Sequence, residues 1–288
     1  MVLAAALLCR AAPPAGRLIV CGWDELFIAD AATGAKSWTW KAADRPELPA
    51  AMRTKFRSID ECKPVDGGRK ILITASSDGV ALIERPGGRV TFWATVVNAH
   101  SAELLPRGRI VAAASHRPGA AGDRLILFDA AAPEKELFQT ECSWAHGVVW
   151  DDARRLLWAI SDRDVRAYRL ANWETAAPSL APAGVYPMPD TSGHDLYPVP
   201  RTPMLSLTTG RHCWLFDRDR RTFQPHPELA DRAGVKCITV NAETGRTVWT
   251  LSEGGNWWTD KLRFLHPEGL LTLPGERIYK ARWMPAAP

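Results

Sequence analysis

The stretch KILITASSDGVALIERPGGRVTFWAT, residues 70–95, contains three apolar segments that two turns separate. The segments are rich in Ile, Val, Leu, Phe and Trp, which favour β-strands, whereas Ser-Asp-Gly and Pro-Gly-Gly favour turns. Each apolar segment is six or seven residues long, which is typical of a strand. The stretch therefore predicts an antiparallel β-meander with strands at residues 70–76, 80–85 and 89–95.

The same pattern recurs four more times along the chain, which indicates a repeated β-sheet unit. Each repeat has an apolar strand, a turn and a second strand, and most repeats add a more polar third strand. The further predicted strands lie at residues 109–115, 124–129, 136–141, 155–161, 164–170, 204–209, 212–217, 222–227, 246–252, 261–266 and 269–274. Repeats of about forty residues in an all-β sequence are typical of the blades of a β-propeller.

The two ends of the chain supply a sixth blade. RLIVCGW, ELFIAD and KSWTWK, at residues 17–23, 25–30 and 36–41, predict three strands, but no strand precedes them to take the innermost position. RIYKARWM, residues 277–284, is one strand more than the last repeat needs. Pairing this strand with the first three closes the ring, and closure leaves few sheet edges exposed. The sequence therefore predicts an all-β, six-bladed propeller over residues 17–288 as one domain.

The composition is that of a globular protein with a packed core. Hydrophobic residues make up 46% of the 288 residues and charged residues 24%, which argues against disorder. The formal charge is +4, and no run of Lys and Arg interleaves with aromatic residues, so a nucleic-acid partner is excluded. Most of the 13 tryptophans are expected to pack between blades, and the alternative is that some line a sugar-binding surface.

Residues 1–16, MVLAAALLCRAAPPAG, resemble a secretory signal, although no basic residue precedes the apolar part. We therefore expect a secreted or periplasmic protein. No later stretch is long and apolar enough to span a membrane, so no integral membrane segment is predicted. We also expect a monomer. The six cysteines form no CxxC pair, which argues against a zinc ribbon or a thioredoxin-like site.

One polar position recurs at the start of the innermost strand of each blade. Counting back nine residues from the second strand of four blades gives Glu61, His100, His146 and His194. Lys236 lies ten residues before Arg246, and the closing strand offers Lys280 or Arg282. Because equivalent positions of a propeller converge on its axis, we expect these side chains to meet in the central channel.

Three interpretations of this ring stay open. Three imidazoles and a carboxylate suit Zn²⁺, Mn²⁺ or Fe²⁺, which makes His100, His146, His194 and Glu61 candidate ligands of a divalent metal. Without a metal, a histidine is a candidate general base, and Lys236 and Lys280 would hold an anionic group or a developing oxyanion. The candidate catalytic residues are therefore His100, His146, His194, Lys236 and Lys280. In the third interpretation, the polar residues only hydrogen-bond across a water-filled channel.

Aromatic and basic side chains are expected beside the ring. Trp144 lies two residues before His146, and Trp257 and Trp258 occupy the loop GGNWWTD. Flat rings suit the faces of sugars, but they pack equally well between blades. The loop RTKFR, which ends at Arg57, is either an anion-binding rim or a solvated turn. The candidate ligand-binding residues are Glu61, Arg57, Trp144, Tyr197, Trp257, Trp258 and Arg282.

Five motifs resemble an uncharacterised family of secreted bacterial six-bladed propellers with a domain of unknown function. The motifs are FRSIDECKPV (56–65), NAHSAELLP (98–106), HGVVWD (146–151), GHDLYPVP (193–200) and YKARW (279–283). The resemblance covers nearly the whole chain after residue 16. It implies the propeller fold and an extracytoplasmic location but no reaction. Its motifs contain Glu61, His100, His146, His194 and Lys280.

The predicted function is a carbohydrate-related propeller that binds a small anionic sugar in the axial channel. One form of this prediction is a metal-assisted lyase or another enzyme acting on sugar acids. Some uronate lyases on β-propellers bind manganese through channel-facing histidines, and that analogy rests on architecture alone. The alternative is a non-catalytic propeller that presents a rim to a glycan or a protein.

Overall fold

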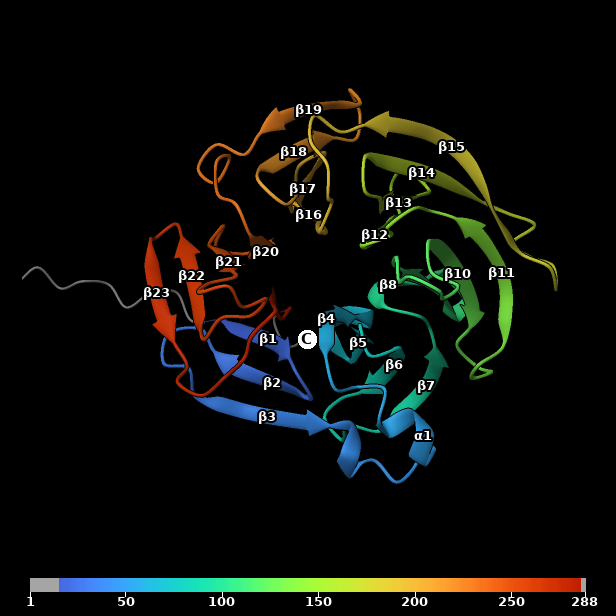
Figure 1. The fold of residues 1–288 in the computed structure, drawn as a ribbon, viewed down its shortest axis with the longest axis horizontal. Helices are drawn as coiled ribbons and strands as arrows, with labels where there is room; N and C mark the ends of the chain where they lie inside the picture. The colour runs from blue at the N-terminus through green and yellow to red at the C-terminus, as the bar shows by residue number, and fades with distance from the viewer. Residues whose placement is uncertain (1–15, 286–288) are drawn as a thin grey trace, which may run out of the picture.

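The fold is the predicted six-bladed β-propeller. The computed structural model describes residues 16–285, which form six four-stranded antiparallel sheets around a central axis (Figure 1). Of the predicted signal segment, residues 1–16, all but Gly16 lie outside the described residues. No helix within residues 16–285 is long and apolar enough to cross a membrane.

Each blade has an innermost strand at the axis and an outermost strand at the rim. Blade 1 contains β24 (Lys280–Trp283), β1 (Arg17–Gly22), β2 (Glu25–Asp30) and β3 (Lys36–Lys41). Blade 2 contains β4 (Ile59–Val65), β5 (Lys70–Ala75), β6 (Gly79–Glu84) and β7 (Val90–Thr95). Blade 3 contains β8 (Ala99–Leu105), β9 (Arg109–Ala114), β10 (Arg124–Asp129) and β11 (Glu136–Glu141).

The other three blades follow the same order from the axis outward. Blade 4 contains β12 (Gly147–Asp151), β13 (Leu156–Ile160), β14 (Asp164–Ala171) and β15 (Ser179–Pro187). Blade 5 contains β16 (Asp195–Pro198), β17 (Met204–Thr208), β18 (Cys213–Asp217) and β19 (Thr222–Pro225). Blade 6 contains β20 (Val235–Val240), β21 (Thr247–Leu251), β22 (Lys261–Leu265) and β23 (Gly269–Thr272). The short helices are η1 (Ala42–Asp44), α1 (Ala50–Arg53), η2 (Asp66–Gly68) and η3 (Pro106–Gly108).

The ring closes as the sequence predicts, because the last strand pairs with the first. β24 is antiparallel to β1, with Leu18 opposite Trp283 and Cys21 opposite Lys280. The closing strand is thus the innermost strand of blade 1, and it brings Lys280 and Arg282 to the axis.

The hydrophobic core lies between neighbouring blades. Both faces of each inner sheet are covered, so β1 buries four successive apolar residues, Leu18, Ile19, Val20 and Cys21. Aromatic side chains fill the gaps between blades; Trp40 of blade 1 packs edge-on against Phe56 at a centroid distance of 6.1 Å. Burial of this apolar surface between adjacent sheets is what holds the blades at fixed positions around the axis.

The outermost strand of blade 4, β15, was not among the strands expected from the sequence. Its sequence SLAPAGVYP contains Pro182 and Gly184, which normally weaken a strand. The strand pairs with β14 only along one side, and its register shifts at this point, with Tyr168 opposite Pro182 and Ala167 opposite Gly184. An edge strand tolerates proline because its outer N–H groups need no partner in the sheet.

Candidate functional site

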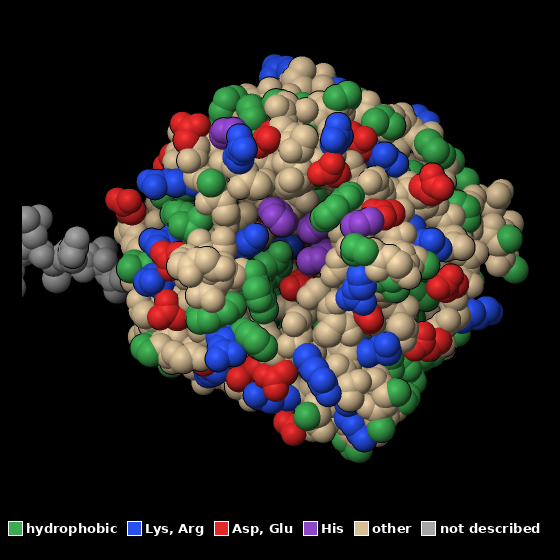
Figure 2. Space-filling model, in the orientation of Figure 1, with side chains coloured by type: hydrophobic (Ala, Val, Ile, Leu, Met, Phe, Trp, Pro, Cys, Tyr) green, Lys and Arg blue, Asp and Glu red, His purple; other side chains and the backbone are tan. Residues whose placement is uncertain are grey.

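Polar side chains from all six blades gather at one mouth of the axial channel, and we call them the polar ring. The ring consists of Asp60, His100, His146, His194, Lys236 and Lys280. Each residue lies within, or just before, the first residues of an innermost strand, so the repeated geometry brings all six blades to the same end of the axis. Figure 2 shows histidine side chains clustered in the central hollow, with Lys or Arg side chains beside them.

The three predicted histidines lie in contact, although they are far apart in the sequence. The rings of His100 and His146 stack with centroids 4.2 Å apart and an interplanar angle of 26°. The ring of His194 meets His146 edge-on at 5.2 Å. The histidines therefore form one continuous imidazole surface along a side of the mouth.

His146 is held in one tautomer. Its Nδ1 lies 2.8 Å from the carbonyl oxygen of Trp144 and 3.2 Å from the hydroxyl of Ser115. Because a carbonyl only accepts hydrogen bonds, Nδ1 must carry the proton, and Nε2 is left with a free lone pair. Burial lowers the pKa of His146 to about 4 against the opposing effect of this hydrogen bond, so the ring is neutral at physiological pH. A neutral imidazole with a fixed Nδ1–H has the form of a general base.

His100 and His194 each hold a buried nitrogen without a partner. The Nδ1 atoms of both residues are shielded from solvent and form no hydrogen bond within residues 16–285. Burial, followed by the charges of the neighbouring ring members, keeps the pKa of both imidazoles well below the usual value. Buried polar atoms in folded proteins are almost always satisfied, so these two nitrogens point to a missing partner.

Lys236 brings a positive charge to the ring without a matching ion pair. Its ammonium lies 5.9 Å from the centre of the Tyr279 ring, and no carboxylate of the described residues forms an ion pair with it. Burial and the nearby charge of Lys280 lower the pKa of Lys236. Desolvation without a counter-ion is unfavourable for an ammonium, which makes this position attractive to an anion.

Asp60 occupies the ring position of blade 2, where the sequence predicts Glu61. Asp60 lies at a β-bulge between Ile59 and Glu61, and β-bulges in blades 3 and 6 place His100 and Lys236 equivalently. The Asp60 carboxylate accepts a hydrogen bond from the backbone N–H of Ser76. Burial raises the pKa of Asp60 to about 7, against the lowering effects of Ser76 and Lys280.

Glu61 lies one layer deeper, in a buried network of four charges. Arg282 donates to Glu61 Oε1 at 2.9 Å and Oε2 at 2.7 Å, and to Asp195 Oδ1 at 2.6 Å and Oδ2 at 3.0 Å. Lys280 donates to Asp195 at 3.0 Å and to Glu61 at 3.4 Å. Both cations outweigh the effect of burial and lower the pKa of each carboxyl. Glu61 and Arg282 are thus fully occupied within this network of four charges. Asp195, its fourth member, was missed by the sequence analysis.

The deeper channel is filled by side chains. The ring of Tyr197 lies 4.1 Å from the guanidinium of Arg282, and Lys63 donates to the carbonyl of Val148 and, at 3.3 Å, to Glu103. These residues and the charge network separate the polar ring from the opposite end of the axis. A ligand at the ring therefore enters from one side.

Three tryptophans stand exposed on the face that carries the ring. Trp144 is 45% exposed, Trp257 37% and Trp23 36%. Trp257 lies 5.7 Å from Tyr279 and 5.5 Å from Trp23. The predicted Trp258 is half-buried against Arg277 at 5.5 Å. Arg57 is exposed in the loop that leads to β4, and its backbone N–H donates to the hydroxyl of Ser77.

A family model described as "Family of unknown function (DUF6528)" matches residues 19–287. The chain belongs to this family. The match covers nearly all of the propeller, including every member of the polar ring. A search of curated proteins found no match to the chain.

The predicted metal site stays a prediction. Within residues 16–285, no group of three or more His, Cys, Asp or Glu side chains is placed to hold a metal ion. The stacked rings of His100 and His146 lie in nearly parallel planes, and the oxygens of Glu61 face Arg282. Metal analysis of the purified DUF6528 protein would test the set of His100, His146, His194 and Glu61.

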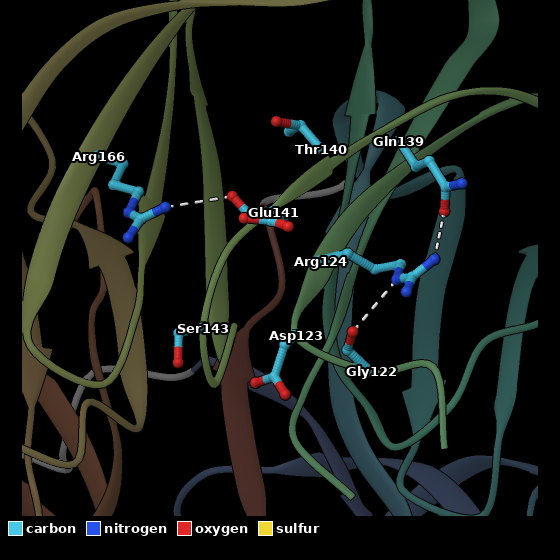
Figure 3. Close-up of a pocket in the computed structure, with 8 residues that line it drawn as sticks. All are labelled: Gly122, Asp123, Arg124, Gln139, Thr140, Glu141, Ser143 and Arg166. Carbon is cyan, nitrogen blue, oxygen red and sulfur yellow. Dashed lines mark hydrogen bonds between the residues drawn. The ribbon is translucent and has the colours of Figure 1, made fainter. Parts of the chain in front are cut away.

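A groove lies at the rim between blades 3 and 4 of the DUF6528 propeller. It has a volume of about 550 Å³ and is lined by Gly122, Asp123, Arg124, Gln139, Thr140, Glu141, Ser143 and Arg166 (Figure 3). Arg124 and Arg166 stand on opposite sides of it, and nearly every lining side chain is polar. None of the residues predicted from the sequence as site residues lines this groove.

Proposed function

We propose that this DUF6528 propeller binds a small sugar acid at the polar ring, with the carboxylate of the sugar beside Lys236. The observation that carries the proposal is the half-buried ammonium of Lys236, which has no ion-pair partner within residues 16–285. A ligand carboxylate would supply the counter-ion and form a charge-assisted hydrogen bond, the strongest type available at such a site.

The histidines support a sugar acid over a simple inorganic anion. A neutral imidazole has one donor nitrogen and one acceptor nitrogen, and a sugar hydroxyl both donates and accepts. The free Nε2 of His146 is therefore suited to a hydroxyl group of the sugar. An inorganic anion such as sulfate only accepts hydrogen bonds and would leave the acceptor nitrogens of the ring unsatisfied.

The same site has the groups needed for proton transfer beside a carboxylate. His146 presents an oriented basic nitrogen, and Lys236 carries positive charge that would stabilise an enolate, whereas Lys280 is already paired with Asp195 and Glu61. Turnover of uronates by the wild type would extend the proposal from binding to catalysis. His146→Gln should abolish this turnover, and His266→Gln, at an exposed histidine, should retain it. Binding without turnover would support the non-catalytic alternative.

The proposal is tested by calorimetric titration of the full chain with D-glucuronate and D-galacturonate. Lys236→Met keeps the length of the side chain and removes its charge, so we expect affinity to fall by roughly 10–100-fold, the scale of one charged hydrogen bond. Lys135→Met is the matched control, because Lys135 is exposed before β11, and it should bind like the wild type.

Neutral D-glucose and D-galactose serve as ligand controls and should bind at least tenfold more weakly than the uronates, because they lack the charge that Lys236 recognises. Two results would overturn the proposal. One is equal affinity of the wild type for glucuronate and glucose. The other is unchanged uronate affinity in Lys236→Met.

A further inference from the structure

We infer that the sugar acid is one unit of an oligosaccharide, whose neighbouring units rest on exposed tryptophans on opposite sides of the polar ring. This inference rests on the proposed function and names its ligand class. The Trp144 platform consists of Trp144 and His116, between blades 3 and 4. The Trp257 platform consists of Trp23, Trp257 and Tyr279, where blades 6 and 1 meet. Figure 1 shows these two junctions on opposite sides of the ring of blades.

The backbone at Trp144 is unfavourable for a tryptophan. Trp144 has φ +50°, in the left-handed region that bulky residues avoid. Three other blades have a left-handed residue at the same place, two positions before a member of the polar ring, and those residues are Asn98, Ser192 and Gly234. Asn and Gly are the residues that this conformation favours. The turn itself therefore does not require a tryptophan, and exposing the ring to water adds a second cost.

Trp23, on the other side of the mouth, also has a left-handed backbone conformation. It occupies the tight turn between β1 and β2 with φ +48°, a position that Gly, Asn or Asp normally fills. Its ring lies 5.5 Å from Trp257 and 4.5 Å from the guanidinium of Arg277. Strained backbone that persists in a fold commonly marks a site of function.

The Trp144 platform is built to hold its tryptophan side chain in place. The ring of His116 stacks on Trp144 at 4.7 Å and 20°. Asp123 ties the pair together, because its carboxylate accepts from the backbone N–H of Trp144 at 2.7 Å and lies 2.7 Å from Nδ1 of His116. His116 thus covers one face of Trp144, and the side chain is still 45% exposed. An aromatic side chain that is already held in place loses little conformational entropy when a ligand stacks on it.

Each platform adjoins the polar ring directly. Tyr279 lies 5.9 Å from the ammonium of Lys236 and 5.7 Å from the ring of Trp257. On the other side, the carbonyl of Trp144 accepts the hydrogen bond that fixes His146. A ligand anchored on Lys236 can therefore extend towards either tryptophan without leaving the protein surface.

The groove between blades 3 and 4 continues the Trp144 platform outward. Asp123 and Ser143, which flank the platform, also line this groove (Figure 3). Arg124 donates to Gln139 and to the carbonyl of Gly122, and further polar atoms line the walls. Aromatic faces receive the C–H groups of a pyranose ring, and polar walls receive its hydroxyls. The polar ring, the Trp144 platform and the groove thus follow one another across the surface, as the units of an oligosaccharide would.

The test compares D-galacturonate with hexamers of galacturonate and mannuronate by titration. We expect the wild type to bind at least one hexamer tenfold or more tightly than the monomer. Trp144→Asn is chosen because blade 3 has Asn98 in the equivalent turn, and Trp23→Asn because Asn tolerates the left-handed backbone of the β1–β2 turn. Each variant should lower hexamer affinity roughly 5–50-fold, the scale of one stacked ring, and leave monomer affinity unchanged. Both variants should melt no lower than the wild type, because Asn relieves the left-handed backbone.

Four outcomes would overturn the inference. If both variants bind the hexamers like the wild type, or if they melt several degrees lower, the tryptophans are structural. If the monomer binds in a Lys236-dependent manner but no hexamer binds more tightly, the inference fails and the proposed function stands. If neither monomer nor hexamer binds the wild type, the proposed function fails as well.

Discussion

At the scale of single residues, the protonation state of Asp60 determines the net charge at the mouth of the channel. The groups that face Asp60 are Ser76, Glu61, Lys236, Tyr279 and Lys280. With a pKa raised to about 7 by burial, Asp60 is neutral below this pH and leaves the charge of Lys236 uncompensated. Above it, the Asp60 carboxylate opposes a second anion at the same place.

We therefore predict that uronate affinity falls as pH rises through about 7, because that is the pKa of Asp60. The histidines stay neutral over this range, since burial holds all three pKa values well below the usual range. Titrations at pH values between about 5.5 and 8 should show a decrease of roughly tenfold in the wild type. Asp60→Asn should keep the high affinity throughout.

Protein stability gives an independent readout of the same residue. A carboxyl whose pKa is raised by folding binds its proton more tightly in the folded state, so the wild type loses stability as pH rises from about 4 to about 7. Asp60→Asn removes this loss and should raise the melting temperature at pH 8. A wild type and variant with the same pH dependence of binding and of melting would refute the assignment to Asp60.

The residue at this position also shows where counting along the sequence reaches its limit. The ring position lies nine residues before Arg109 in blade 3, but ten residues before Lys70 in blade 2, because the turn after β4 is one residue longer. Adjacent side chains of a strand point in different directions, so an error of one residue exchanges Asp60 for Glu61. The ten-residue spacing found for Lys236 was a signal that could have identified Asp60.

At the scale of elements, the closing strand β24 is fixed by charges as well as by its hydrogen bonds to β1. It carries Lys280 and Arg282, which bind Glu61 on β4 and Asp195 on β16. β4 and β16 belong to blades 2 and 5, so this network joins three blades across the axis. Buried charges of this kind are costly to leave unpaired, which ties the strand to one register.

We predict that Arg282→Met lowers the free energy of unfolding by about 3–5 kcal/mol, because Glu61 and Asp195 would each lose a bidentate partner in the protein interior. Arg89→Met is the control. Arg89 pairs with Glu84 at 67% side-chain exposure, and its loss should change stability by less than about 1 kcal/mol. Equal urea-unfolding midpoints for the two variants would show that the buried network does not stabilise the closure.

Element prediction succeeded where the strands are apolar and failed where a strand needs little apolar surface. β5, β9 and β13 lie inside the blades and show as continuous apolar runs in the sequence. β15 lies on the rim, where only one edge is paired, and its proline and glycine hide it. Side-chain pairings across the axis, such as Arg282 with Asp195, depend on the depth of each strand in the channel, and a linear repeat does not contain that information.

At the scale of the whole molecule, the propeller converts a repeated position into a single site. Each of the six blades contributes one polar side chain to the same mouth of the channel. Because side chains fill the channel below, a ligand reaches the polar ring only through this mouth. The spare strand at the end of the chain was enough to predict that six blades close into a propeller. The ligand was not predictable to the same degree, because it depends on which charges stay uncompensated once all side chains are packed.

The most direct test of the sugar-acid site is a crystal structure of the protein soaked with D-glucuronate at about pH 6. The carboxylate should lie within hydrogen-bonding distance of the Lys236 ammonium, and a sugar hydroxyl should meet the Nε2 of His146. Glucuronate bound only elsewhere, or an unoccupied mouth at saturating concentration, would contradict the account.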